Sequence, residues 1–308
     1  SPQQSNVTSY GATAVAIITL EAFAGMWINA FVVSVLCMGW VKKKILNSNE
    51  KILLLLGCSR LCNLCISWIH FFLLIIYPNY LYVHPTFQLL VCIQSFLNYS
   101  DLWVSASLCV FYCVKIANFR NSCFIYLKVK IDRMVPGLLL GSVLVSLVLS
   151  IILYNEMDKA LSKNLNYTCQ GHIWKASIIR EERFFANRFI VGLVFVTSFM
   201  VVIFSALLLL FSLWRHKRNM QTNCMKDLSM DAHIRAMKSI LSFFIMYSIN
   251  FIFLILSLIY YVKEENHMLI LIAPVLHAFP GFHSLILICS NPKLEKTMLR
   301  VLPCVKCK

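Results

Sequence analysis

Seven long apolar stretches constrain this chain more than any other feature of its sequence. Each is long enough for a membrane-crossing helix, which needs about 20 mostly apolar residues. The fourth is the clearest, because it contains no charged residue. The predicted fold class is therefore an all-α membrane protein, a seven-transmembrane helix bundle. The seven stretches are 11–41, 51–76, 87–114, 134–154, 186–214, 239–262 and 268–290.

The composition excludes a soluble protein of this size. Apolar residues make up 59% of the chain and charged residues 13%, with a mean hydropathy of +0.75. Soluble domains are roughly 45–50% apolar and about 25% charged. A net charge of +15 is high enough for a nucleic-acid-binding protein, but the basic residues lie between the apolar stretches and not along one soluble face. We therefore expect membrane lipids, and no nucleic acid, around this chain.

The positions of lysine and arginine predict the orientation of the bundle. Most of the 28 basic residues lie at 42–51, 115–133, 215–238 and 293–308. On the other side they concentrate in the 155–188 loop, where acidic residues dilute them. Because basic residues near span ends favour the cytoplasm, we expect the N-terminus outside and the C-terminus inside.

The chain reads as a single domain over 1–308, because no internal repeat or low-complexity linker divides it. We expect a short extracellular N-terminus at 1–10 and a short cytoplasmic segment at 291–308. Two Asn-x-Thr triplets, at Asn6 and Asn166, fall on the expected outside and are candidate N-glycosylation sites. The expected location is the plasma membrane, crossed several times.

Arg60 interrupts the second apolar stretch. Ionisable residues inside a bilayer are costly and need partners. We expect Arg60 to face the bundle interior as a structural hub, with Asn29 and Ser284 as partners. The alternative is that Arg60 snorkels into the headgroup region. Asp101, in the third stretch, needs its own partner, for which we expect Arg60 or a neighbouring hydroxyl.

Gln94 and Asn98 lie four residues apart in the outer half of the third stretch, hence on one helical face. Amides at that depth either tie helices together or line a wet cavity, and the spacing leaves both alternatives open. In the seventh stretch, His277 and His283 are six residues apart and do not share a face, so we expect no metal site. The chain contains no HExxH, GxSxG or P-loop sequence, and we expect neither an enzyme nor a cofactor.

Several short motifs along the chain recur in one group of membrane proteins. They are GMWINAFV at 25–32, CSR at 58–60, FYCVKIANF at 111–119, LKVKI at 127–131, LLLG at 138–141, SLWRHKRNMQ at 212–221, DAHIRAMKSILSF at 231–243, HSLILI at 283–288 and NPKLEK at 291–296. In this order they resemble the type 2 (bitter) taste receptors, a family of G-protein-coupled receptors.

The resemblance implies that bitter small-molecule agonists bind in the extracellular half of the bundle. Asn98 occupies a third-span position that often contacts agonist in this family. Gln94 stands where many members have Trp, Asn250 lies near a commonly aromatic site, and Ala273 replaces a residue that is often polar or acidic. The candidate ligand-binding residues are Gln94, Leu97, Asn98, Phe189, Asn250, Phe251, Phe253, Ala273, Leu276 and His277.

The resemblance also implies activation of a heterotrimeric G protein, with a gustducin-type or other inhibitory-class α subunit and βγ. Positive charge at the cytoplasmic ends would face this partner, or would only set topology and contact anionic lipid. The candidate G-protein-facing residues are Lys115, Arg120, Lys128, Lys130, His216, Lys217, His233 and Lys238.

Two alternatives share the expected architecture. A pheromone-type or rhodopsin-like small-molecule receptor is one, but the rhodopsin-like class normally carries Asp-Arg-Tyr at the end of the third span, where this chain has Tyr112-Cys113-Val114. A transporter is a weaker alternative, because paired half-repeats with broken helices are not visible in the sequence.

Overall fold

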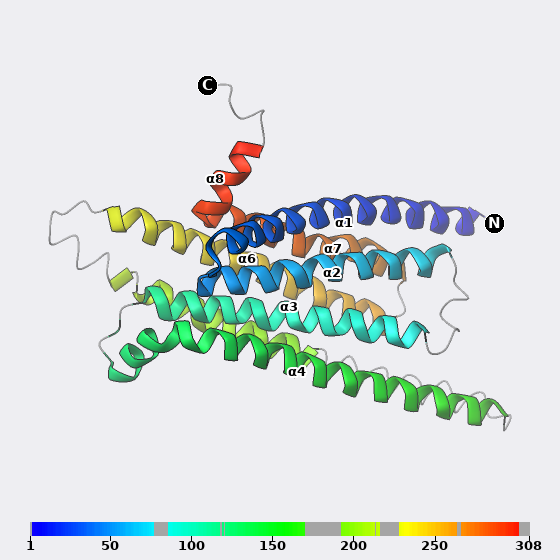
Figure 1. Ribbon diagram of the computed structural model, residues 1–308. Coiled ribbons are helices and arrows are strands. Elements are labelled where there is room, and N and C mark those ends of the chain that lie inside the picture. The colour runs from blue at the N-terminus through cyan, green and yellow to red at the C-terminus, as the bar shows by residue number, and fades with distance from the viewer. Residues whose placement is uncertain are drawn as a thin grey trace.

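The computed structural model describes residues 2–76, 86–117, 119, 121–169, 192–212, 214–215, 228–263 and 266–301. All regular structure in these ranges is helical. Long helices run side by side in one bundle, and the short helix α8 leaves it at a steep angle (Figure 1). The helices are α1 (Pro2–Lys43), α2 (Ser48–Ile76), α3 (Thr86–Ile116), α4 (Ser122–Cys169), α6 (Leu228–Val262), α7 (Asn266–Ser290) and α8 (Pro292–Val301), with a further helical segment at Gly192–Ser212.

Six helices in the described part of the chain are long and apolar enough to cross a membrane. They lie in α1, α2, α4, the segment Gly192–Ser212, α6 and α7, which confirms a multi-spanning helical protein. The remaining predicted span, 87–114, is present as α3 but is not among the six. Polar residues such as Gln94 and Asn98 lower its hydropathy. Because α3 packs between α2 and α4, these residues can face other helices instead of lipid.

Several helices extend beyond the predicted apolar stretches. The fourth stretch was predicted at 134–154, but α4 extends from Ser122 to Cys169. Helix α6 begins at Leu228 and not near 239, and α1 begins at Pro2, within the segment predicted as a short N-terminus. An apolar stretch reports only the thickness of the lipid, whereas backbone hydrogen bonding can continue a helix into water. Helix α8 was not predicted, because it is too short and polar to produce a hydropathy signal.

Local contacts at the ends of several helices determine where each helix begins or ends. Lys44 has a φ of 56° after α1, a left-handed conformation typical of a helix C-terminus. At the start of α2, the backbone N–H of Asn47 donates to Glu50 Oε2 at 3.1 Å, half of a capping box. Asn121 and Asn291 each accept a first-turn N–H, of α4 and α8 respectively, at 3.0 Å.

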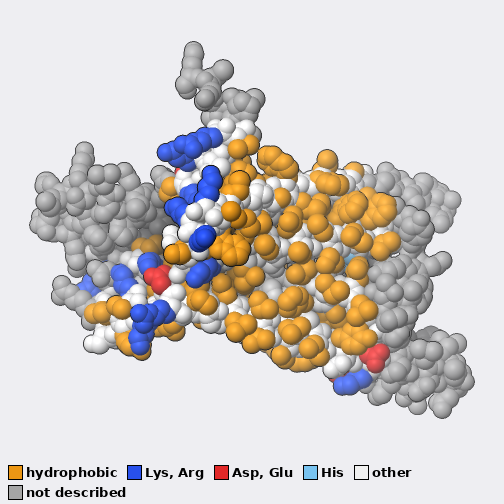
Figure 2. Space-filling view, in the orientation of Figure 1, with side chains coloured by type: hydrophobic (Ala, Val, Ile, Leu, Met, Phe, Trp, Pro, Cys, Tyr) orange, Lys and Arg blue, Asp and Glu red, His pale blue; other side chains and the backbone are white. Residues whose placement is uncertain are grey.

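Apolar side chains cover the middle of the bundle surface (Figure 2). Leu20 is 72% exposed and Phe204 is 66% exposed. An apolar surface this continuous would be unstable in water but is suited to lipid. Described Lys and Arg side chains gather mainly at the end of the bundle where α8 emerges (Figure 2). The surface therefore has an apolar belt and one strongly basic end.

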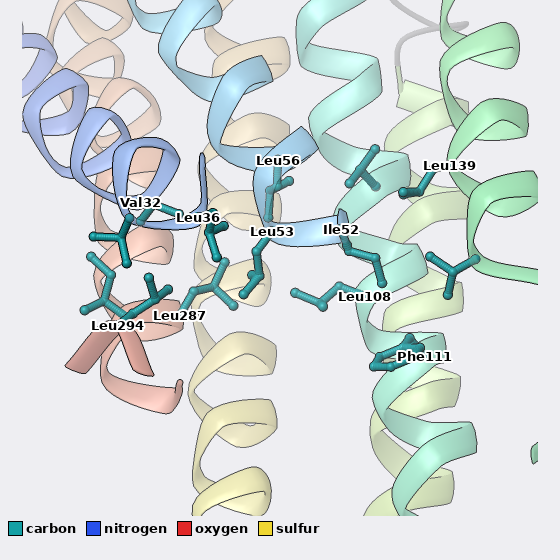
Figure 3. Packing of buried hydrophobic residues seen from close by; sticks show 14 of the residues in the cluster. Val32, Leu36, Ile52, Leu53, Leu56, Leu108, Phe111, Leu139, Leu287 and Leu294 are labelled. Atoms are coloured by element: carbon teal, nitrogen blue, oxygen red, sulfur yellow. The ribbon is translucent and has the colours of Figure 1, made fainter. Parts of the chain in front are cut away.

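Buried apolar side chains hold the basic end of the bundle together. They come from α1, α2, α3, α4, α7 and α8 and point toward one another (Figure 3). Leu294 in the first turn of α8 is 0% exposed, so this helix is anchored in the same cluster. Labelled members are Val32, Leu36, Ile52, Leu53, Leu56, Leu108, Phe111, Leu139, Leu287 and Leu294.

Two glycines allow α1 and α7 to approach closely. A Cβ placed on Gly281 would lie 3.4 Å from Cα of Gly25, and one placed on Gly25 would lie 2.9 Å from Cδ1 of Leu64. Small residues at helix crossings are typical of membrane bundles, where close packing drives association. The crossing of α1 and α7 therefore depends on the absence of a side chain at Gly281, while the absence of one at Gly25 leaves room for Leu64 of α2.

We expect Gly281→Leu to destabilise the protein, because a side chain there would separate α1 from α7. Overpacking costs about 1–3 kcal/mol. The measurement is the thermal midpoint of the detergent-solubilised protein. Gly141→Leu is the matched control, because no atom lies within 4 Å of a Cβ at Gly141. Equal midpoints for the two variants would contradict the role of this crossing.

Candidate functional site

Arg60 of α2 lies in the centre of the bundle and is 0% exposed. Its Nε donates to Asp101 Oδ1 of α3 at 2.6 Å. Its Nη1 donates to Ser284 Oγ of α7 at 2.9 Å, and Nη2 donates to Ser105 Oγ of α3 at 3.2 Å. Nη2 also contacts His283 Nδ1 of α7. The guanidinium thus joins three helices and carries a carboxylate partner inside the bundle.

The contact with Arg60 decides the tautomer of a neutral His283. Arginine has no acceptor, so His283 Nδ1 must accept, and the proton of a neutral ring then sits on Nε2. Two aromatic rings of α6 pack against this imidazole, with centroids 4.0 Å away for Phe243 and 6.0 Å away for Tyr247. Helix α6 therefore contacts the Arg60 cluster through aromatic packing.

Asn29 connects α1 to the same cluster. Ser284 Oγ donates to Asn29 Oδ1 at 2.7 Å, and Asn29 Nδ2 donates to the Gly25 carbonyl at 2.8 Å. Of the two partners expected for Arg60, Ser284 is in direct contact and Asn29 is one hydrogen bond further away. Arg60 is fully buried and paired with the Asp101 carboxylate, whereas a snorkelling side chain would extend into the headgroup region. The cluster brings together α1, α2, α3, α6 and α7.

The two amides in the outer half of α3 bond to α2. Asn63 Nδ2 donates to Asn98 Oδ1 at 2.7 Å, and Gln94 Nε2 donates to Ser67 Oγ at 3.0 Å. Ser67 Oγ in turn donates to Asn63 Oδ1 at 3.4 Å. Both α3 amides are half-buried, so they tie helices together while part of each side chain stays accessible.

The other candidate ligand-binding residues lie mainly on α6 and α7. Asn250 is 9% exposed. The ring of Phe251 stacks on Phe199 with centroids 4.8 Å apart, and His277 meets the edge of Phe71 at 5.9 Å. Phe189 lies outside the described residues. The remaining candidates are half-buried: Leu97 of α3, Phe253 of α6, and Ala273 and Leu276 of α7.

The FYCVKIANF motif holds the basic end of α3 against its neighbours. Tyr112 donates to Asn49 Oδ1 of α2 at 3.1 Å. Ala117 is 0% exposed and packs with residues of the segment Gly192–Ser212 and of α6. The ring of Phe119 meets the edge of Phe124 with centroids 5.0 Å apart. Most of the motif therefore serves packing between helices.

Three of the candidate G-protein-facing residues make contacts within the bundle. Lys115 forms an ion pair with Asp132 of α4 at 2.5 Å, with both side chains about half exposed. Lys128 donates to the Ala117 carbonyl at 2.9 Å, and Lys130 donates to the Tyr126 hydroxyl at 2.5 Å. Outside the described part lie Arg120, His216 and Lys217, and the side chains of His233, Lys238, Asn6 and Asn166.

Sequence reasoning missed Asn63 and Ser67, which carry the contacts between α2 and the α3 amides. A usable signal was present, because Arg60, Asn63 and Ser67 follow an i, i+3, i+7 spacing that places them on one helical face. The ion pair between Glu50 and Lys293 was also missed; it joins α2 to α8 at 2.5 Å. That pairing spans most of the chain, so no local pattern could indicate it.

The family model described as "Taste receptor protein (TAS2R)" matches residues 7–306. The chain belongs to this family. Taste receptor type 2 member 7 of Macaca mulatta is 32% identical over 294 residues, which cover 92% of this chain and 90% of that protein. Taste receptor type 2 member 9 of Homo sapiens is 31% identical over 294 residues, covering 94% and 93%. The resemblance to the type 2 taste receptors is confirmed, and the chain is a bitter taste receptor.

Membership of this family relates the fold and the site to a class of proteins. The family is a receptor family and not a family of enzymes, and its members generally bind ligands and couple to G proteins. Family membership and the six apolar helices together indicate that this receptor is a multi-pass membrane protein.

We expect Arg60→Ala to remove most folded receptor from the cell surface. Breaking a buried ion pair on one side costs about 3–5 kcal/mol, because Asp101 would keep an uncompensated charge. Surface labelling relative to total receptor measures the effect. The double variant Arg60→Ala with Asp101→Ala should recover part of the loss, because it buries no charge. Additive losses in the double variant would contradict a coupled pair.

Proposed function

We propose that this bitter taste receptor crosses the plasma membrane seven times as one domain, with its N-terminus outside. The six apolar helices support this, and α3 supplies the seventh crossing because its polar side chains bond to α2. The gathering of Lys and Arg at the α8 end supports a cytoplasmic position for that end (Figure 2). In this orientation Asn6 and Asn166 lie outside and are available for N-glycosylation.

The proposed agonist site lies in the outer half of the bundle, beside the amides of α3. The observation that carries it is the pairing of Asn98 with Asn63: the Asn98 carbonyl accepts at 2.7 Å, which leaves its Nδ2 to donate to a ligand. Apolar and aromatic side chains of α6 and α7, including Phe251 and Leu276, would provide contact area for bitter small molecules.

The proposed route of activation runs along α2. Asn63 and Arg60 are three residues apart, so an agonist that alters the contact between Asn98 and Asn63 acts one helical turn from the Arg60 cluster. An agonist shifts the receptor only through a difference in affinity between its states. Each tenfold preference for the active state corresponds to about 1.4 kcal/mol.

The proposed partner is a heterotrimeric G protein of the gustducin type, or one with another inhibitory-class α subunit, together with βγ. It would dock at the basic end, where α3 and α4 present Lys115 and Lys130. Both side chains are exposed, and opening the ion pair between Lys115 and Asp132 would free two charges for the partner.

The agonist site is tested with Asn98→Ala against Asn63→Ala. Both substitutions remove the same interhelical hydrogen bond, but only Asn98→Ala removes a group that contacts agonist. We expect a loss of potency of at least tenfold for Asn98→Ala and a smaller loss for Asn63→Ala. The measurement is the dose–response curve of calcium signalling for several bitter agonists, at matched surface expression. Equal shifts for the two variants would show that Asn98 only ties helices.

The docking surface is tested with Lys130→Glu against Lys159→Glu at the opposite end of α4. Lys130 lies at the basic end, so reversing its charge should slow agonist-dependent nucleotide exchange on purified gustducin by several-fold, while agonist binding persists. Lys159→Glu should leave exchange unchanged. If neither variant alters exchange, the α3–α4 face is not the docking surface.

A further inference from the structure

Helix α8 is amphipathic, and its two faces meet different surroundings. Leu294, Met298 and Val301 follow an i, i+4, i+7 spacing on one face. Leu294 is fully buried and Met298 packs against the same apolar cluster, whereas Val301, the last residue of α8, is 54% exposed. The apolar face of α8 thus continues from the protein core to its periphery, where the apolar belt ends.

The opposite face of α8 is basic. Lys293, Lys296 and Arg300 follow an i, i+3, i+7 spacing, and the last two are exposed. Lys293 turns back to the bundle, where its Nζ lies 2.5 Å from Glu50 Oε1 of α2. The exposed positive charge of α8 therefore comes from Lys296 and Arg300.

The turn between α1 and α2 carries a second group of positive charges. Lys42 and Lys43 end α1 and Lys44 follows it, and all three side chains are exposed. Apolar residues flank them on both sides, with Val41 76% exposed and Ile45 74% exposed. A run of lysines between exposed apolar side chains is suited to the border between lipid and water.

Contacts in the structure place α8 beside the end of α1 that carries the second group. A Cβ on Gly39, in the last turns of α1, would lie 2.7 Å from Lys293 Nζ, so the side chain of Lys293 in the first turn of α8 reaches the end of α1. Figure 2 shows Lys and Arg side chains following one another from α8 to the adjoining end of the bundle. We call Lys42, Lys43, Lys44, Lys296 and Arg300 the basic corner.

Little acidic charge offsets the basic corner. Glu50 is engaged by Lys293 and also interacts electrostatically with Lys43. Glu295 is the one acidic residue of α8. Among the described residues, no ion pair is formed by Lys42, Lys44, Lys296 or Arg300. Several cations therefore point outward at the level where the apolar belt ends.

We propose that the basic corner binds the headgroup of an anionic phospholipid in the adjacent leaflet. Clusters of basic residues beside a membrane span or on an amphipathic helix attract anionic lipids. Phosphate groups would be held by Lys44 from the α1–α2 turn and by Lys296 and Arg300 from α8, while Val301 and Ile45 sit against the acyl chains. The inference rests on the proposed function only in its orientation, which makes this leaflet the cytoplasmic one.

The test is retention of lipid by purified full-length receptor in native mass spectrometry. Phosphatidylinositol 4,5-bisphosphate is the probe, and phosphatidylcholine at the same concentration is the neutral reference. The site variant combines Lys44→Gln, Lys296→Gln and Arg300→Gln. Each basic residue near the surface contributes roughly a fivefold factor. We therefore expect retention of the probe to fall by about a hundredfold and retention of phosphatidylcholine to stay constant.

The matched control combines Lys130→Gln, Arg133→Gln and Arg215→Gln, which remove the same charge from exposed positions at the same end. It should retain the probe nearly as well as the wild type. An equal loss in both variants would show a general electrostatic attraction. No loss in the site variant would show that the basic corner does not bind this lipid and is available to another partner, such as an acidic protein segment. Either result overturns the proposal. The measurement needs neither agonist nor G protein, so its failure is separate from failure of the proposed function.

Discussion

The bundle is organised around one buried guanidinium. Moving an ion of this kind out of water costs several kcal/mol, and only a carboxylate and well-placed hydrogen bonds offset that cost. Asp101 supplies the carboxylate, while Ser105, Ser284 and His283 supply the remaining contacts of Arg60. These partners come from α3 and α7, and Asn29 extends the network to α1. The positions of these helices are therefore set by the need to satisfy a single side chain.

The same requirement explains the unusual composition of α3. Because α3 packs between α2 and α4, it can carry the polar residues that the Arg60 cluster and the outer amides need. Its outer half bonds to α2 through Asn98 and Gln94, and its basic end bonds to α2 through Tyr112. One pair of helices thus connects the proposed agonist site, the central cluster and the proposed docking surface. A coupling between sites requires an element that both can bias, and the α2–α3 pair has contacts at all three levels.

The basic end combines several roles that sequence alone does not separate. Lys115 and Lys293 form ion pairs that join α3 to α4 and α8 to α2. Lys130 is exposed on α4, in the proposed docking surface, while Lys296 and Arg300 are exposed on the basic face of α8. The positive charge that favours a cytoplasmic position is therefore divided among internal ion pairs, the proposed protein contact and the proposed lipid contact.

The sequence by itself determined the membrane as the solvent, the helical class, the basic end and the family. These follow from hydropathy, from the distribution of charge and from motifs such as FYCVKIANF, all of which are local properties of the chain. It also indicated that Arg60 needs internal partners, because the cost of a charge in lipid is independent of the fold. Only the tertiary structure decided which partners Arg60 has, and it connects Asn29 to Arg60 through Ser284. It also showed that Gln94 bonds to Ser67 and Asn98 to Asn63. These contacts, like that of Lys293 with Glu50, are between residues far apart in the chain. Only the packing of the helices brings such residues within hydrogen-bonding distance.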